Sequence, residues 1–127
     1  MKHCSRIMMA GDVRLELSAD LTDEGVVVFI AGGTKEHVGG VAMSLPRESL
    51  SGKGHSCDTW ILPVPGHKDT VVAEKASARI CNELKIPAVV TAGIHIDAAT
   101  GGQIADIEAT CLLLSDQLVE WARSLRV

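Results

Sequence analysis

Residues 25–40, GVVVFIAGGTKEHVGG, decide the fold because they join an apolar strand to a glycine-rich loop. Six consecutive apolar residues, Val26 to Ala31, run directly into Gly32-Gly33-Thr34. A short β-branched run bounded by glycines is typical of a strand buried in a sheet. Glycines after such a strand leave backbone N–H groups accessible, and these groups can hold an anion. His37 follows three residues after Thr34 and can face the same hollow.

The rest of the chain predicts an α+β two-layer sandwich, in which two helices cover a mostly antiparallel sheet of about five strands. The expected strands are residues 12–20, 25–31, 38–45, 59–64 and 88–96, and the expected helices are residues 69–84 and 102–125. The last strand is apolar on both faces, so we expect it to be central or covered. Residues 46–56 are polar and rich in Gly and Ser, which favours an exposed loop. Nothing divides the chain, so we expect one domain of residues 1–127.

The expected C-terminal helix carries an apolar heptad stripe of Ile104, Ile107, Cys111, Leu114, Leu118, Trp121 and Leu125. Such a stripe suits packing against a sheet or against a partner helix, and we favour the helix's own sheet. At ~1.5 Å per residue the helix is roughly 36 Å long, whereas five strands at ~4.8 Å span roughly 19 to 24 Å. We therefore expect the Leu118–Leu125 end to overhang the sheet and to meet a symmetry mate in a homodimer.

Composition argues against several classes of function. The net charge is −4, the pI is about 5.7 and no basic run occurs, which argues against binding to nucleic acid backbones. One Phe, two Trp and no Tyr provide no stacking platform for bases. The N-terminus lacks a signal-peptide core and no stretch is long enough to span a bilayer, so we expect a cytoplasmic protein that does not enter membranes.

Four cysteines are spread through the chain without a CxxC motif. Without a signal peptide, they are expected to be reduced rather than bridged. Cys81 and Cys111 fall on apolar faces of the expected helices, where a thiol packs as a small hydrophobe. Cys57 lies in a polar segment and is the one thiol that the pattern leaves open to reaction.

Two further junctions place a glycine and a histidine at the end of an expected strand. Residues 65–69, Pro65-Gly66-His67-Lys68-Asp69, lead into a helix, where Asp69 suits a helix cap and Lys68 suits an anion. Residues 91–97 end the last strand, and His95 and Asp97 point to one face if the strand persists. A capped loop or a structural histidine would explain either junction alone, so the repetition is the functional signal.

Two interpretations of these junctions stay open. The histidines and carboxylates could hold a divalent metal, although they show no recognised ligand spacing; they are His37, His67, His95, Asp69 and Asp97. Alternatively, the glycine loops and Lys68 hold a phosphorylated ligand whose polar edges meet the imidazoles. No GxSxG, P-loop or GxGxxG motif occurs, so a nucleophilic enzyme is unsupported. His3 and His55 lie outside the junctions and are discounted.

Three blocks resemble, in order and spacing, the small LpdD-like proteins: GGTKEHVGGVAM, PGHKDTVVAEKAS and VVTAGIHID. The resemblance covers residues 25–97. It implies a chaperone for prenylated flavin mononucleotide that is encoded with UbiD-type aromatic acid decarboxylases. The family also looks similar to the proteasome-assembly-chaperone fold, a small α+β sandwich that dimerises.

The resemblance further implies a binding protein rather than an enzyme. It would deliver prenylated FMN (or FMN) to a UbiD-type decarboxylase, with a flavin prenyltransferase as a second partner. The residues implied to bind the cofactor are Gly32, Gly33, Thr34, His37, Gly66, His67, Lys68, Asp69, Gly93, His95 and Asp97. The alternatives are a small metal-dependent enzyme that uses His37, His67 and His95, and an assembly chaperone for a larger protein complex.

Overall fold

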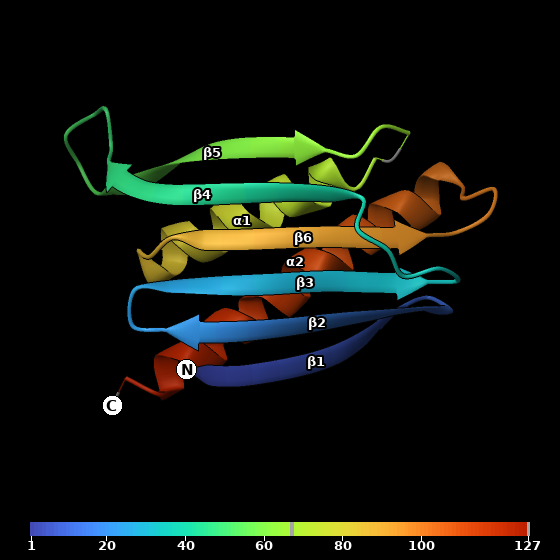
Figure 1. Cartoon of the computed structure of the whole chain (residues 1–127), viewed down its shortest axis with the longest axis horizontal. Coiled ribbons are helices and arrows are strands. Elements are labelled where there is room, and N and C mark those ends of the chain that lie inside the picture. The colour runs from blue at the N-terminus through green and yellow to red at the C-terminus, as the bar shows by residue number, and fades with distance from the viewer. Residues whose placement is uncertain (67, 127) are drawn as a thin grey trace.

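The computed structural model describes residues 1–66 and 68–126, which form a six-stranded sheet with both helices on one face (Figure 1). In chain order the elements are β1 (Lys2–Ala10), β2 (Val13–Thr22), β3 (Gly25–Gly33), β4 (Gly40–Glu48), β5 (His55–Pro63), α1 (Thr70–Leu84), β6 (Ala88–His95) and α2 (Gly101–Ser124). The strand order is β1-β2-β3-β6-β4-β5, and only β3 and β6 pair in parallel. The predicted α+β sandwich is confirmed, with six strands in place of about five.

The strand expected to be central, β6, lies between β3 and β4. Val90 pairs with Val28 on one side and with Ala42 on the other, and all three side chains are buried. Because β3 and β6 are parallel and β4 is antiparallel to both β5 and β6, strands β3, β5 and β6 all end at the same edge. The loops that follow these three strands are the three junctions singled out above.

The first strand was not predicted from the sequence. β1 pairs with β2 along its whole length, from Lys2 opposite Leu21 to Ala10 opposite Val13. Its helix-facing side includes the half-buried Arg6, whereas Ile7 and Met9 are exposed on the other side. The usual alternation of apolar and polar residues is therefore blurred. His3, discounted as part of an exposed terminus, lies in this strand with Nδ1 3.0 Å from Asp20 Oδ1.

The expected loop at residues 46–56 is also shorter than predicted. β4 continues to Glu48 and β5 begins at His55, so the connection comprises residues 49–54. Pairing between β4 and β6 ends at Ser44, so Pro46 interrupts no ladder on that side. Cys57 consequently lies in β5, half-buried against the core, and not in a polar loop.

Of the predicted stripe, α2 buries Ile107, Cys111, Leu114 and Leu118 but leaves Ile104 exposed. Cys81 and Cys111 are buried as expected. Leu118 is fully buried on α2, as is Ala122 one turn later, because α2 packs against β1, β2 and α1. The prediction that the helix overhangs from Leu118 onward is therefore wrong. A sixth strand at the β1 edge widens the sheet and supplies the surface that this end of the helix covers. Only Leu125, at the end of the stripe, is largely exposed there.

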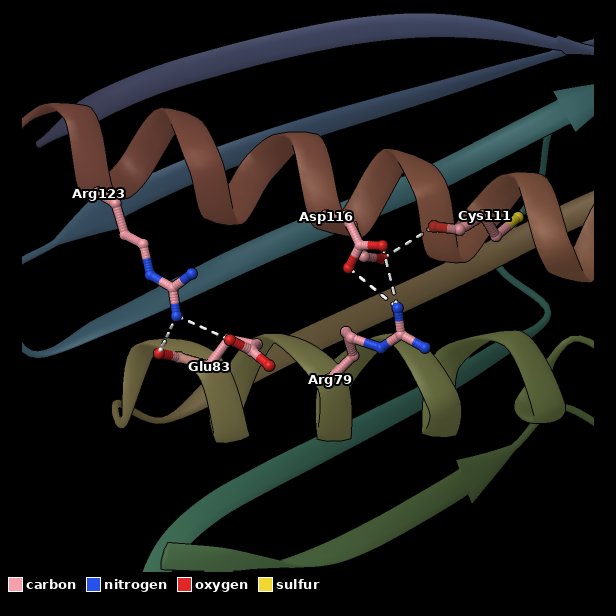
Figure 2. A network of polar contacts seen from close by, with 6 residues as sticks. Arg79, Glu83, Cys111, Asp116 and Arg123 are labelled. Atoms are coloured by element: carbon pink, nitrogen blue, oxygen red, sulfur yellow. Dashed lines mark hydrogen bonds and ion pairs between the residues drawn. The ribbon is translucent and has the colours of Figure 1, made fainter.

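Two ion pairs join the helices across their outer surfaces (Figure 2). Arg79 Nη1 donates to both carboxylate oxygens of Asp116 at 3.0 Å. Arg123 Nη2 donates to Glu83 Oε2 at 2.7 Å and to the Glu83 carbonyl at 3.1 Å. These contacts fix α1 against α2, whose N-terminal ends both lie near the sheet edge where the junctions meet. Within the described ranges, neither helix is both long and apolar enough to cross a membrane.

Candidate functional site

The three junctions contact one another at the carboxyl ends of β3 and β6. The backbone N–H of Thr34 donates to the His95 carbonyl at 2.9 Å, and the Thr34 hydroxyl donates to the same oxygen at 3.2 Å. The N–H of Gly39 donates to the Ala92 carbonyl at 2.9 Å. The first junction is therefore held to the third by backbone hydrogen bonds, and segment 34–39 passes across the end of β6 toward β4 (Figure 1).

Asp69 connects the second junction to the other two. The sequence predicts a helix cap, but its carboxylate makes no capping hydrogen bond to α1, so that prediction is wrong. Oδ1 accepts the backbone N–H of Ile94 at 3.0 Å instead. β4 begins at Gly40, opposite Ala92, so β6 has no strand neighbour on that side at Ile94. The carboxylate supplies the acceptor that a neighbouring strand would otherwise provide.

The second carboxylate oxygen of Asp69 holds His37. Oδ2 lies 2.9 Å from His37 Nε2, and the carbonyl of Lys35 lies 3.0 Å from Nδ1. The imidazole ring is therefore held from both sides, by the Lys35 carbonyl at Nδ1 and by the Asp69 carboxylate at Nε2. Both side chains are largely buried, at 17% and 9% exposure. The pair is a buried clamp that fastens the 34–39 segment to the start of α1.

The glycines of these junctions are closely packed against other backbone. A Cβ built on Gly93 would lie 1.4 Å from the His37 carbonyl oxygen, and one on Gly33 would lie 2.1 Å from that of His95. Gly33 also has a φ of +75°, which disfavours any other residue. A Cβ on Gly32 would lie 2.3 Å from the Arg14 carbonyl oxygen. In this structure these glycines allow the segments to cross, and Gly32 and Gly93 are buried.

His95 and Asp97 form a second pair at the end of β6, as their spacing predicts. His95 Nε2 lies 2.9 Å from Asp97 Oδ1, and both side chains are much more exposed than the His37–Asp69 pair. Among residues 1–66 and 68–126, no three His, Cys, Asp or Glu side chains gather as a metal site. For the metal-binding interpretation, the described residues provide two separate pairs, His37–Asp69 and His95–Asp97. His67 lies outside the described residues.

A cavity of about 380 Å³ opens beside these pairs, between the first turns of α1 and α2 and the end of β6. Ligand sites typically measure about 300–1,000 Å³. Four of the predicted site residues line it, namely Gly66, Lys68, Asp69 and His95. Gly33 and Thr34 instead line a separate hollow of about 260 Å³ on the β2 side of Ile96. The predicted residues are therefore not gathered around one cavity, because Gly32, His37, Gly93 and Asp97 line neither hollow.

Most of the cavity wall is apolar, and the sequence reasoning missed it. The apolar lining residues are Val71, Val72, Ile94, Ile96, Ala99, Ile104 and Ile107. Glu108 adds a carboxylate that Lys75 pairs with at 3.3 Å. The sequence offered one signal, since Val71 and Ile104 are apolar residues in the first turns of the two helices. Both side chains are well exposed in the structure.

The two helix starts that flank the cavity differ in how their backbone N–H groups are satisfied. α2 has a complete capping box, in which Thr100 accepts from the Gln103 N–H and Gln103 accepts from the Thr100 N–H. α1 has neither a side-chain cap nor an acidic residue in its first turn. Within residues 1–66 and 68–126, the Asp69 carbonyl accepts the N–H of Ala73 at 3.1 Å, and the N–H groups of a first helical turn that has no side-chain cap can bind an acceptor from outside the helix. Lys68 precedes this helix by two residues and lines the cavity.

The electrostatic surroundings of the cavity are mixed. Burial raises the pKa of the Cys111 thiol to about 12, and the charges of Glu108 and Asp69 add to the effect. This thiol is therefore neutral and unreactive at physiological pH. Lys68 and the N-terminal dipole of α1 provide positive potential on one side of the cavity, whereas Glu108 provides negative charge on another. The arrangement suits a ligand with an anionic end and a large apolar body.

Comparisons with known proteins agree with this arrangement. Residues 9–123 match the family model described as the prenylated flavin chaperone LpdD-like domain. The chain is 29% identical over 103 residues to Protein LpdD of Lactiplantibacillus plantarum (strain ATCC BAA-793 / NCIMB 8826 / WCFS1), covering 78% of this chain and 70% of that protein. A solved chaperone complex for yeast 20S proteasome assembly contains a chain with a TM-score of 0.64 and 12% identity, over 94% of both chains. That similarity shows the fold alone, whereas the family match shows that the chain belongs to the LpdD-like prenylated flavin chaperone family.

Proposed function

We propose that this protein binds prenylated FMN, or FMN itself, and delivers it to a UbiD-type aromatic acid decarboxylase. The observation that carries the proposal is a family match over residues 9–123, in a chain with a cavity of suitable size beside an uncapped helix. The protein would act as a carrier and not as an enzyme. In support, the described part of the cavity wall offers no nucleophile paired with a base.

The phosphate of the nucleotide would bind at the start of α1. A phosphate carries acceptor oxygens that can accept from the N–H groups of the first helical turn, and the helix dipole favours its charge there. Lys68 would add a charge-assisted hydrogen bond. Asp69 would stay engaged with Ile94 and His37, which keeps its negative charge occupied near the phosphate.

The prenylated ring system would occupy the apolar part of the cavity. The branched side chains of Val71, Ile94, Ile104 and Ile107 offer a dry wall for a flat hydrocarbon-rich ring. His95 at the mouth would meet a polar edge of the ring, held in place by its contact with Asp97. The described lining residues include no Phe, Tyr or Trp, so binding would depend on burial and on the phosphate rather than on stacking.

The remaining predicted residues would support the site rather than contact the ligand. Gly32, Gly33 and Gly93 allow the three junctions to approach one another, and His37 fastens them. Thr34 would fix the end of β6 through the His95 carbonyl. The proposed partners are the decarboxylase that receives the cofactor and the flavin prenyltransferase that makes it, and the proposed location is the cytoplasm.

Co-expression with a flavin prenyltransferase tests this proposal. The purified protein should be coloured, show a flavin-like absorption spectrum and activate an apo-decarboxylase on mixing. A variant with a charge in the cavity wall, Ile107→Glu, should lose the colour. The matched control, Leu113→Glu, lies on the same helix in an exposed position outside the cavity and should keep it. A colourless wild-type protein that does not improve decarboxylase activation would refute the proposal.

A further inference from the structure

Two of the four cysteines lie opposite each other between the sheet and α1. Cys57, the thiol that the sequence leaves open to reaction, belongs to β5 and is half-buried against the core. Cys81 lies on α1 and is fully buried. All four thiols of the chain are free. The proposed function gives neither Cys57 nor Cys81 a role, because neither lines the cavity.

A chain of hydroxyl groups fixes the position of α1 relative to β5. Ser44 Oγ lies 2.7 Å from Thr59 Oγ1 in β5, and Ser44 Oγ donates to Ser77 Oγ of α1 at 2.9 Å. Ser44 and Ser77 are fully buried, and the Ser77 hydroxyl donates onward to the Glu74 carbonyl at 3.1 Å. Thr59 and Ser77 are therefore held close together through one shared hydroxyl.

The two cysteines lie one step further along the same strand and helix. β5 ends at the sheet edge where α1 begins, so the helix runs antiparallel to the strand (Figure 1). Cys57 precedes Thr59 by two residues, on the same face of the strand and about 6.6 Å back along it. Cys81 follows Ser77 by one helical turn, about 6 Å along the helix in that same direction. The register that joins Thr59 to Ser77 therefore brings Cys57 beside Cys81.

The side chains of the two cysteines interact directly. Burial raises the pKa of Cys81 to about 11, and the charge of Cys57 and a hydrogen bond with its side chain add to that rise. Cys57 Sγ also lies 4.0 Å from Thr59 Oγ1, the last group of the hydroxyl chain. β5 is an edge strand that pairs with β4 alone, so it can move toward α1 more easily than an inner strand can.

We infer that Cys57 and Cys81 form an oxidation site, at which a peroxide converts the two free thiols into an intramolecular disulfide. The sulfur of Cys57, which water can reach, attacks one peroxide oxygen. The S–O bond forms, the O–O bond breaks, and one water leaves with the thiol proton. The sulfur of Cys81 then attacks the sulfenic acid on Cys57. The S–S bond forms, the S–O bond breaks, and the departing hydroxide takes the Cys81 proton as a second water.

The other two cysteines have different surroundings. Cys4 and Cys111 are both buried, so a peroxide reaches them less easily than it reaches Cys57. The charges that act on these two thiols are those of Arg6, and of Glu108 and Asp69, and not those of another thiol. Oxidation should therefore join Cys57 to Cys81 and leave Cys4 and Cys111 reduced.

The disulfide would tie an edge strand to the helix that carries part of the cavity wall. It would close the segment 57–81, which contains the second junction and the first turn of α1. A cross-link of this kind restricts the unfolded chain, so the oxidised protein should unfold at a higher urea concentration than the reduced protein. Because the pair lies outside the cavity lining, the inference does not depend on flavin binding.

Peptide mapping of the wild-type protein tests the inference. The protein is treated with hydrogen peroxide, alkylated in denaturant and digested with trypsin. Peptides 54–68 and 80–85 should appear as one disulfide-linked species, and the free thiols should fall from four to two per chain. The peptides that contain Cys4 and Cys111 should be fully alkylated. Oxidation of Cys57 to a sulfinic acid without a cross-link, or a disulfide between two chains, would overturn the inference.

Two matched variants separate this site from general thiol oxidation. In Cys57→Ser, all three remaining thiols should still be alkylated after peroxide treatment, and the urea midpoint should not rise. In Cys111→Ser, the link between peptides 54–68 and 80–85 should form as in wild type. Loss of two thiols in Cys57→Ser at the wild-type rate would contradict the assignment of Cys57 as the attacking thiol.

Discussion

Asp69 Oδ2 lies 2.9 Å from His37 Nε2, although 32 residues separate them and each belongs to a different strand-end loop. The other oxygen of the same carboxylate accepts the N–H of Ile94 in a third segment. One side chain thus connects the three junctions that carry the family resemblance. Its role is to organise the site, and the predictions below test that role separately from ligand binding.

Removing the Asp69 carboxylate should unfold the protein more readily. Asp69→Ala leaves the buried His37 ring and the Ile94 N–H without this acceptor, and each buried polar group left unsatisfied costs about 1–3 kcal/mol. The matched control is Asp97→Ala, whose side chain is 89% exposed and whose pairing with His95 should contribute no more than about 1 kcal/mol. Urea denaturation checks both values. Similar losses for the two variants would show that the clamp does not hold the junctions together.

Replacing Gly93 tests whether the segments cross as closely as the structure shows. Gly93→Ala places a methyl group 1.4 Å from the His37 carbonyl oxygen, which is backbone and cannot rotate away. The loss should be at least about 3 kcal/mol, or the variant should fail to fold. Gly101→Ala is the control, because its Cβ would meet nothing within 4 Å at the start of α2. It should be neutral or stabilising by up to about 1 kcal/mol in thermal or urea unfolding.

Stability should fall in alkaline solution because of three buried thiols, Cys4, Cys81 and Cys111, and burial raises the pKa of the Cys4 thiol. Burial raises the pKa of Cys81 to about 11 and that of Cys111 to about 12, from an ordinary value of 9.0. Above pH 9 these thiols ionise in the unfolded chain but not in the folded one, so rising pH favours unfolding. Cys81 and Cys111 should each lower the free energy of unfolding by about 1.4 kcal/mol per pH unit between pH 9 and pH 11.

Cys111→Ala should remove one thiol's share of that slope, about 1.4 kcal/mol per pH unit. The chain has no tyrosine, which ionises near pH 10, and the lysines are the same in wild type and variant, so their contribution cancels in the comparison. The measurement is a series of urea denaturation curves from pH 8 to pH 10. An unchanged slope in Cys111→Ala would mean that this thiol is accessible to water in the native state.

The sequence allowed most of the fold to be predicted, because β3 and β6 have continuous apolar runs and both helices have clear apolar stripes. β1 was not predicted because Arg6 lies on its inner side and Ile7 on its outer side, which removes the alternation that identifies a strand. The prediction that the end of α2 overhangs the sheet was wrong because β1 had not been predicted. Without β1, the sheet is too narrow to cover Leu118.

The sequence identified the loops that meet at the end of β6 but not how their residues contact one another. The spacing of glycine and histidine identified three loops that meet at one sheet edge. It could not show that the Gly93 position is filled by the backbone of His37, because such contacts depend on which strands are neighbours. It also could not show that Asp69 turns away from α1 and leaves that helix uncapped. The apolar cavity wall arises only when the first turns of both helices lie side by side.

The most direct test of the account is the affinity of wild type and Lys68→Ala for FMN and for riboflavin, which lacks the phosphate. A charge-assisted hydrogen bond contributes about 1.5–3 kcal/mol, so Lys68→Ala should bind FMN roughly tenfold to a hundredfold more weakly. Riboflavin binding and folding stability should be almost unchanged. Lys53→Ala, in the 49–54 connection outside the cavity lining, should bind both ligands like wild type. An equal loss for both ligands in Lys68→Ala, or no loss for either, would contradict a phosphate site at the start of α1.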